Sequence, residues 1–378
     1  MARQIALACA FAALAAGIAC RSEPAPAPAA IRFLHTFSPG ETELFNETIA
    51  ERGLAVESSL VPFARGQQVI HEILREGSGC PDLIRIDATW LPGLRASLLP
   101  VPAELAALDW TPEAAALGQL DGAMWGVPQA VDGLIVLRDA ALPAPRSPRL
   151  HDLLAAARAA HSETRRHPLG VRVDGYWLVP WLRAEGADLA VGSIDDDGGV
   201  RALAQFAALF GDLAAPPPPA GSEAPDELRR WQAHEVAYWI TGPWQLGALR
   251  EPERVAVSAL AHAPRGGQLL VVPACARHPD QGWRLATELS SDPVATRLAH
   301  RFATVPTRVS ALPSAPPLAR AAYDALRGAE MLPREPVTPL LFDDLNPALA
   351  AVVARDATAD EAIEGVRRGW HRLVRGAR

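Results

Sequence analysis

Strands and helices alternate in the first hundred residues, and this order constrains the fold more than any other feature of the chain. We expect strand, helix, strand, helix and strand over residues 31–37, 38–52, 54–63, 66–76 and 83–86. The first helix has the clearest boundaries, because Ser38 and Glu41 form a capping box and Gly53 follows the last turn. Such alternation predicts a parallel α/β sheet. Ligands bind such sheets beyond the carboxyl ends of the strands, so polar residues there are site candidates.

Length and charge narrow the class of protein. The chain has 378 residues, which at about 100–200 residues per domain predicts two domains or lobes. Its net charge is −7 and its 36 basic residues are all arginine, without a basic stripe, so a nucleic-acid partner is not expected. The absence of lysine from the sequence excludes a P-loop or a Schiff-base lysine. No metal-ligand motif or dinucleotide fingerprint is found, so we expect no metal and no cofactor.

The N-terminus has the pattern of an export signal. Residues 1–19 combine a short basic start with an apolar run over 5–18, which is too short to span a bilayer. The run ends at Cys20 in a sequence that resembles a bacterial lipobox, with Gly17 where that motif prefers leucine. Lipidation of Cys20 is therefore expected, and ordinary signal cleavage is the alternative. The Pro/Ala-rich segment 20–30 then reads as an extended tether.

Two cysteines remain for the folded part, Cys80 and Cys275. Export to an oxidising compartment would permit a disulfide between them. Two separate buried thiols are the alternative, and the sequence alone slightly favours it.

Tryptophan is unusually common, with ten residues against three tyrosines and nine phenylalanines. Several tryptophans follow a glycine, a proline or a strand end, among them Trp90, Trp125, Trp177 and Trp244. An indole in such a loop can offer a flat apolar face to the C–H surface of a sugar ring. Nearby carboxylates can accept hydrogen bonds from sugar hydroxyls. Core packing is the alternative for each tryptophan, and capping or a solvated surface for each acid.

Five segments in order resemble one family. They are IRFLHTFSPGE (31–41), PDLIRIDATWL (81–91), WGVPQAVDGL (125–134), YWITGPW (238–244) and VPTR (305–308). Together they resemble the extracellular solute-binding proteins of ABC importers, in the sugar-binding branch that includes maltose- and trehalose-binding proteins. The resemblance implies a periplasmic-binding-protein-like α/β fold, with two lobes around a hinged ligand cleft. Lobe one would hold residues 31–137 and 268–312, and lobe two residues 138–267 and 313–378.

The resemblance also implies roles for particular residues. Hydrogen bonds to sugar hydroxyls would come from Glu41, Asp87, Asp132 and Arg308. Stacking on sugar rings would come from Trp244 and from one or more of Tyr176, Trp177 and Trp181. Gln129 is a further ligand-contact candidate, at a position where the family often has an aromatic residue or arginine. Trp90 is another ligand-contact candidate, with packing of the helix after Asp87 as its alternative. His35 and Arg65 are secondary candidates, with a structural or surface role as their alternative.

The function implied is capture without catalysis. A monomer tethered through lipidated Cys20 at a membrane, periplasmic or at the cell surface, would bind a disaccharide or oligosaccharide and deliver it to an ABC permease. Two alternatives stay open. One is a secreted glycan-active hydrolase that uses two carboxylates. The other is a tethered sensory or scaffold protein that kept the fold without transport.

Overall fold

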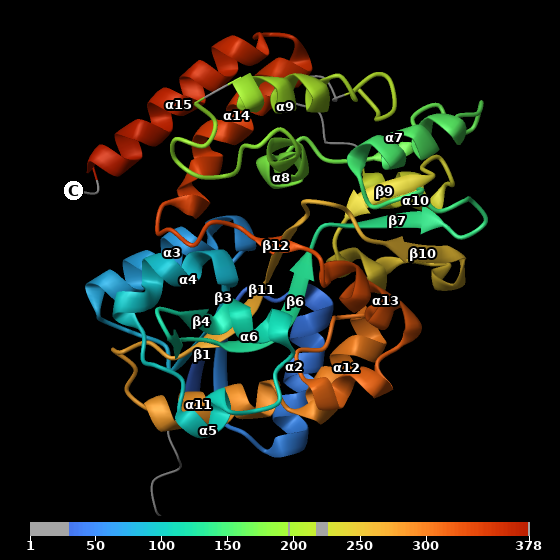
Figure 1. The fold of residues 1–378 in the computed structure, drawn as a ribbon. Helices are drawn as coiled ribbons and strands as arrows, with labels where there is room; N and C mark the ends of the chain where they lie inside the picture. The colour runs from blue at the N-terminus through green and yellow to red at the C-terminus, as the bar shows by residue number, and fades with distance from the viewer. Residues whose placement is uncertain (1–29, 196, 217–225, 377–378) are drawn as a thin grey trace, which may run out of the picture.

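The computed structural model describes residues 30–195, 197–216 and 226–376. The predicted signal peptide, Cys20 and the tether up to residue 29 lie outside the described residues. Figure 1 shows two lobes, one built on a six-stranded sheet and the other on a four-stranded sheet. This two-lobed α/β arrangement confirms the predicted fold class. In the described part of the chain, every helix is too short or too polar to cross a lipid bilayer.

The larger sheet has the strand order β12-β11-β3-β1-β2, and β6 also pairs with β11. Its strands are β1 (Ile31–His35), β2 (Val56–Leu60), β3 (Leu83–Asp87), β6 (Val127–Gly133), β11 (Pro264–Val271) and β12 (Glu330–Met331). The first three strands are parallel, as the sequence predicts. The prediction of a parallel sheet is wrong for the sheet as a whole, because β11 runs antiparallel to both β3 and β6. The reason is that β11 returns from the other lobe and enters the sheet from the opposite end.

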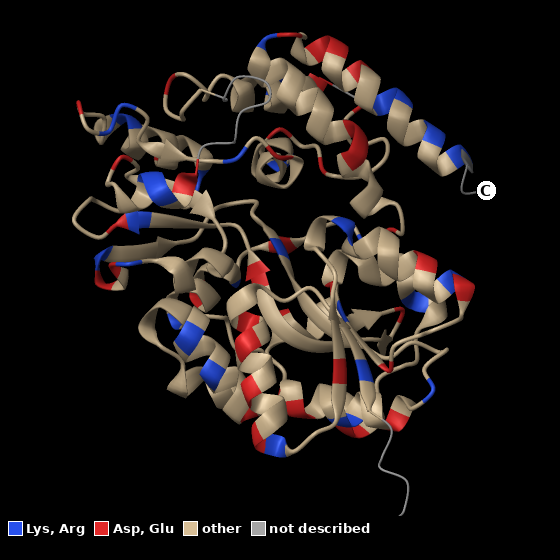
Figure 2. Ribbon diagram, turned by 180° about the vertical axis from the view of Figure 1, so that it is seen from behind, with Lys and Arg blue, Asp and Glu red and all other residues tan. Residues whose placement is uncertain are grey.

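Helices cover both faces of this sheet (Figure 1). They are α2 (Pro39–Arg52), α3 (Phe63–Glu76), α4 (Leu91–Leu94), α5 (Ala103–Ala106), α6 (Pro112–Gly118), α11 (Pro279–Leu289) and α12 (Asp292–Phe302). The predicted capping box at Ser38 and Glu41 is present, and Gly53 ends α2 in the left-handed conformation. Arginines of α12 pair with acids of α2, which lie beside them in Figure 2; the pairs join Arg297 and Arg301 to Glu43, Glu47 and Glu51.

The second lobe is built on the sheet β10-β7-β9-β8. Its strands are β7 (Ile135–Asp139), β8 (Leu169–Gly170), β9 (Tyr238–Thr241) and β10 (Val255–Ser258). The helices are α7 (Leu150–Ala159), α8 (Gly175–Ala184), α9 (Asp197–Ala207), α10 (Glu227–Gln232), α14 (Leu341–Ala354) and α15 (Ala359–Gly376), and the 3-10 turn η3 covers Pro243–Ala248. A capping box of Thr358 and Glu361 starts α15, whose acids lie near its start and arginines near its end (Figure 2). That order of charge complements the helix dipole.

The chain passes between the lobes at three places near the site. It leaves the larger sheet after β6 and enters the smaller one at β7, and it returns through β11. It then runs through α13 (Pro317–Leu326), which packs on β10, β7 and β6, to β12 of the larger sheet, and it crosses a third time between β12 and α14 of the second lobe. Repeated crossing of this kind suits lobes that move about a hinge. The residue boundaries of the lobes given above stay a prediction.

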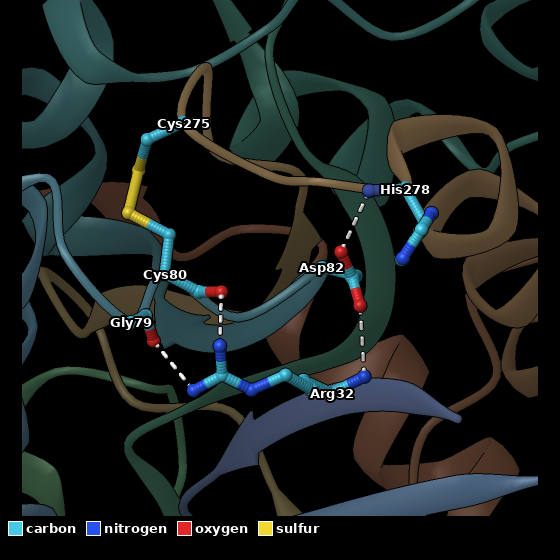
Figure 3. The surroundings of a disulfide bond; sticks show 6 residues. All are labelled: Arg32, Gly79, Cys80, Asp82, Cys275 and His278. Carbon is cyan, nitrogen blue, oxygen red and sulfur yellow. Dashed lines mark hydrogen bonds between the residues drawn. A yellow bond between two sulfur atoms is a disulfide. The ribbon is translucent and has the colours of Figure 1, made fainter. Parts of the chain in front are cut away.

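Cys80 and Cys275 form a disulfide with 5.9 Å between their Cα atoms (Figure 3). The slight preference of the sequence for two separate thiols is therefore wrong. Two segments 195 residues apart meet here, and a separation of that size carries no signal in local sequence. Beside the disulfide, the Arg32 guanidinium donates to the carbonyl oxygens of Cys80 and Gly79. Asp82 joins the same segments, since its carboxylate accepts from the backbone N–H groups of Arg32 and His278.

Candidate functional site

Three polar side chains lie next to one another on the central strands of the larger sheet. Asp87 ends β3, Gln268 lies opposite it on β11, and Asp132 on β6 lies opposite Gly266 of β11. Because side chains alternate along a strand, Gln268 and the Gly266 position share one face of the sheet. The Asp87 Oδ1 atom accepts from the backbone and hydroxyl groups of Thr89, at 2.8 and 2.5 Å. Its Oδ2 atom accepts from Gln268 Nε2 at 3.3 Å.

A buried arginine holds the neighbouring residues in place. The Arg85 guanidinium donates to Gln129 Oε1 at 2.6 Å and to Glu41 Oε1 at 3.1 Å. It also donates to the carbonyl and hydroxyl oxygens of Thr36 and stacks over the Phe37 ring, 4.6 Å from its centre. Four hydrogen bonds and an aromatic face therefore fix this cation. Glu41 and Gln129 are both hydrogen-bonded to Arg85, and their contact with a ligand stays a prediction.

Three side chains of the site have pKa values shifted from their ordinary ones, although water can reach part of this surface. Asp132 is only partly covered, yet burial and repulsion from the Asp87 carboxylate raise its pKa to about 7. Burial also raises the pKa of Asp87, against the opposing effect of the hydrogen bonds from Thr89. His35 is almost completely buried, and burial together with the charge of Arg85 lowers its pKa to about 4. At neutral pH the histidine is uncharged, and burial disfavours the charged forms of both carboxylates.

The second lobe contributes Tyr176, the second residue of α8. Asp174 caps this helix by accepting from the Tyr176 backbone N–H at 2.9 Å. The Tyr176 hydroxyl donates to the Pro264 carbonyl oxygen at 3.4 Å, and burial, together with the charges of Asp132 and Asp87, raises its pKa. A Cβ atom at Gly266 would lie 3.0 Å from Asp132 Oδ1 and 3.7 Å from the Tyr176 hydroxyl. Glycine at this position thus keeps a small space open between an acid of one lobe and a phenol of the other.

Two tryptophans extend this group along the second lobe. Trp177 is buried, donates from Nε1 to the Ile240 carbonyl oxygen at 2.8 Å, and packs edge-on against both Tyr176 and Trp244. Trp244 is 45% exposed, so its ring can contact a ligand. The ring folds back over Gly242, where a Cβ atom would lie 2.0 Å from it. The sequence Gly-Pro-Trp therefore sets the position of the indole, and the edge-on contact with Trp177 holds it there.

The other predicted site residues lie elsewhere. Trp181 is not placed to contact a ligand between the lobes, because it is 1% exposed and packs edge-on against Phe206 in the second core. Trp181 lies four residues, about one helical turn, after Trp177, so both side chains are on the helix face that packs into the lobe. Arg308 is held on lobe one by its ion pair with Asp109 and lies over a tryptophan ring, 5.4 Å from its centre. Arg65 is an exposed residue of α3.

Trp90 follows the packing alternative rather than the ligand-contact one. It is 5% exposed, and a Cβ atom at Gly66 would lie 2.6 Å from its ring. Its exposed neighbour is Phe63, which begins α3 and lies 5.3 Å from it between ring centres. Phe63 follows the carboxyl end of β2, so it is the aromatic residue of lobe one that a ligand there could reach. Its position at the end of the strand predicted over residues 54–63 is the available signal.

Sequence reasoning also missed Arg85, Gln268 and Thr89. Arg85 sits in an otherwise apolar strand, and a charged residue in a buried strand indicates a polar network. Thr89 follows Asp87 with the spacing of an Asx turn. Gln268 has no local signal, because its role depends on the pairing of β11 with β3.

The fold is shared with many solved structures. The GacH receptor of Streptomyces glaucescens, studied unliganded and with acarbose, superimposes with a TM-score of 0.78 at 23% identity, covering 92% of this chain and 98% of that one. Maltose-bound MalE3 of T. maritima gives 0.78 at 18%, over 91% and 99%. The sugar-binding protein MalE of Xanthomonas citri gives 0.76 at 19%, over 92% and 98%. The chain has the fold of the sugar-binding proteins of ABC importers.

Comparison by sequence alone identifies no relative of this chain. No family model matches the chain, and no characterised protein matches it by sequence. With identities of 14–23% among the structural neighbours, the likeness lies in the fold. The ligands named for those structures are ligands of those proteins, and the shared fold does not assign them to this chain.

Proposed function

We propose that this protein is the substrate-binding component of an ABC importer, and that it captures a disaccharide or oligosaccharide between its lobes. The observation that carries the proposal is the meeting of Asp87, Gln268 and Asp132 from one lobe with Tyr176 from the other. Carboxylate oxygens are strong acceptors for hydroxyl hydrogens. The exposed ring of Trp244 supplies the flat apolar surface that a pyranose requires.

The mechanism needs no covalent chemistry. A sugar that contacts Asp87 in one lobe and Trp244 in the other interacts fully only when the lobes are closed. Its differential contacts therefore shift the population from open to closed forms. The permease would distinguish these forms and accept the ligand from the closed one. We propose no catalytic role for the carboxylates.

A thermal-shift screen over neutral and amine-bearing sugars tests the proposal directly. A sugar present at 100 times its dissociation constant should stabilise the native protein by about 2.7 kcal/mol. Incubation of the same sugars with the protein, followed by product analysis, should show no cleavage. The proposal fails if no sugar raises the melting temperature, or if the sugar that binds is hydrolysed.

Membrane attachment is part of the proposal and has its own test. We propose that Cys20 carries the lipid and that the following Pro/Ala-rich segment lets the folded part reach the permease. The variant Cys20→Ala should be released from the membrane fraction, while Cys9→Ala, within the predicted signal peptide, should stay bound. Equal membrane association of wild type and Cys20→Ala would contradict lipidation.

A further inference from the structure

The polar groups that meet between the lobes are matched to a ligand rich in donors. The hydroxyl of Thr89 gives its hydrogen to Asp87, and that of Tyr176 gives its hydrogen to the Pro264 carbonyl. Arg85 donates four of its five N–H groups in hydrogen bonds to Gln129, Thr36 and Glu41. The oxygens of Asp87, Asp132 and Tyr176 keep lone pairs that a ligand can use.

Gln268 adds an acceptor that has no partner. Its side chain is 8% exposed, and Nε2 is directed to Asp87. Within the described ranges Oε1 is buried without a hydrogen bond. The reverse orientation of the amide would place Oε1 against the ionised Asp87 carboxylate, which is repulsive. A buried acceptor left unpaired costs about 1–3 kcal/mol, and a ligand that donates to it recovers this cost.

The charges of these side chains also favour a ligand rich in donors, because negative charge is in excess at the site. Asp87, Asp132 and Glu41 carry up to three negative charges against the single positive charge of Arg85. Among the described residues, neither Asp87 nor Asp132 has an ion-pair partner within 4 Å, whereas Glu41 is paired with Arg85. The site therefore lacks one or two positive charges that a ligand could supply.

Resting on the function proposed above, we propose that the sugar carries a protonated amine, bound by the carboxylates of Asp87 and Asp132 and by Gln268 Oε1. An ammonium group brings one positive charge and three N–H donors, which matches two carboxylates and one amide oxygen. A neutral hydroxyl brings one donor, and its lone pairs would face the carboxylates. The ligand class is thus an amino sugar or aminocyclitol glycoside rather than a neutral oligosaccharide.

Matched ligand pairs test this inference by calorimetric titration at pH 7. Each pair is a neutral sugar and its amine analogue: cellobiose with the glucosamine dimer, and trehalose with trehalosamine. The N-acetylated glucosamine dimer serves as a neutral control of similar linkage. We expect at least one amine to bind tenfold or more tightly than its neutral parent. In the isosteric variant Asp132→Asn that preference should fall to threefold or less.

The matched control is Asp121→Asn, which removes an equal charge at an exposed turn of the same lobe, where the acid forms an ion pair with Arg95. This variant should keep the full preference for the amine. If neutral parents bind as tightly as their amines, the inference is overturned while the proposed function stands. If neither amines nor neutral sugars bind, the proposed function fails and the inference fails with it. Preservation of the amine preference in Asp132→Asn would also overturn the inference.

Discussion

The variant Asp132→Asn should make the unliganded protein more stable at alkaline pH. The pKa of Asp132 is about 7 in the folded protein, against an ordinary value of 3.8 for this carboxyl group. A raised carboxyl pKa favours folding while the group is protonated, and this contribution is lost as the pH rises from about 4 to about 7. The shift corresponds to at most about 4 kcal/mol, because one pKa unit is worth about 1.4 kcal/mol. Asp87 shares the effect, so the expected gain for Asp132→Asn is about 1–3 kcal/mol at pH 8.

The assay is urea unfolding of wild type and variant between pH 4 and pH 8. The comparison uses the difference between the two curves, because other groups titrate in this range. The lowered pKa of His35 acts with the opposite sign, and the raised pKa of Glu227 with the same sign. Both occur in wild type and variant and largely cancel in the difference. The stability difference should grow as the pH rises and level off above pH 7.

A variant that is equally stable at pH 4 and less stable at pH 8 would refute this reasoning. It would mean that the ionised Asp132 is stabilised by its surroundings rather than held at a cost. In that case the neighbouring acids would form a structural network rather than a binding site whose charge a ligand compensates. Asp121→Asn, at an exposed turn, should show no such pH-dependent difference.

Three further predictions follow from local structure. Replacing Cys80 and Cys275 with alanine should lower stability by up to about 5 kcal/mol in the chain-entropy estimate for a loop of 195 residues, and reductant should then have no effect on the variant's urea midpoint. Gly242→Ala should weaken sugar binding at least fivefold in titration with little change in melting temperature, because the new Cβ displaces the exposed Trp244 ring. His35→Gln should reduce the loss of stability that urea unfolding detects between pH 6.5 and pH 4. The neutral, buried histidine favours folding above its unfolded pKa, and this stabilisation is lost on acidification. An unchanged acid dependence in the variant would contradict this.

The sequence predicts the local elements of lobe one well because their signals are local. The capping box at Ser38, the glycine after each of the first two helices and the alternation of strands depend only on neighbouring residues. The antiparallel direction of β11 could not be predicted, because direction depends on how the chain returns from the other lobe. The Cys80–Cys275 pairing was missed for the same physical reason.

The candidate site could be predicted only in part. Asp87, Asp132, Tyr176 and Trp244 were found through strand ends and the resemblance to a family. Their placement near one another depends on sheet pairing and on the approach of two lobes. Trp181 shows the converse limit, since a cluster of aromatic residues in sequence does not say which of them a helix turns toward the core.

The central claim is that a sugar bridges the two lobes, and titration of Asp87→Ala and Trp244→Ala tests it most directly. Loss of a charged hydrogen-bond partner should cost about 1.5–3 kcal/mol of binding, and loss of the ring a similar amount. Each variant should therefore bind the sugar found in the screen at least tenfold more weakly, while the melting temperature without sugar changes little. Wild-type affinity in both variants, together with a large fall in that melting temperature, would contradict the claim and leave these residues as structural groups.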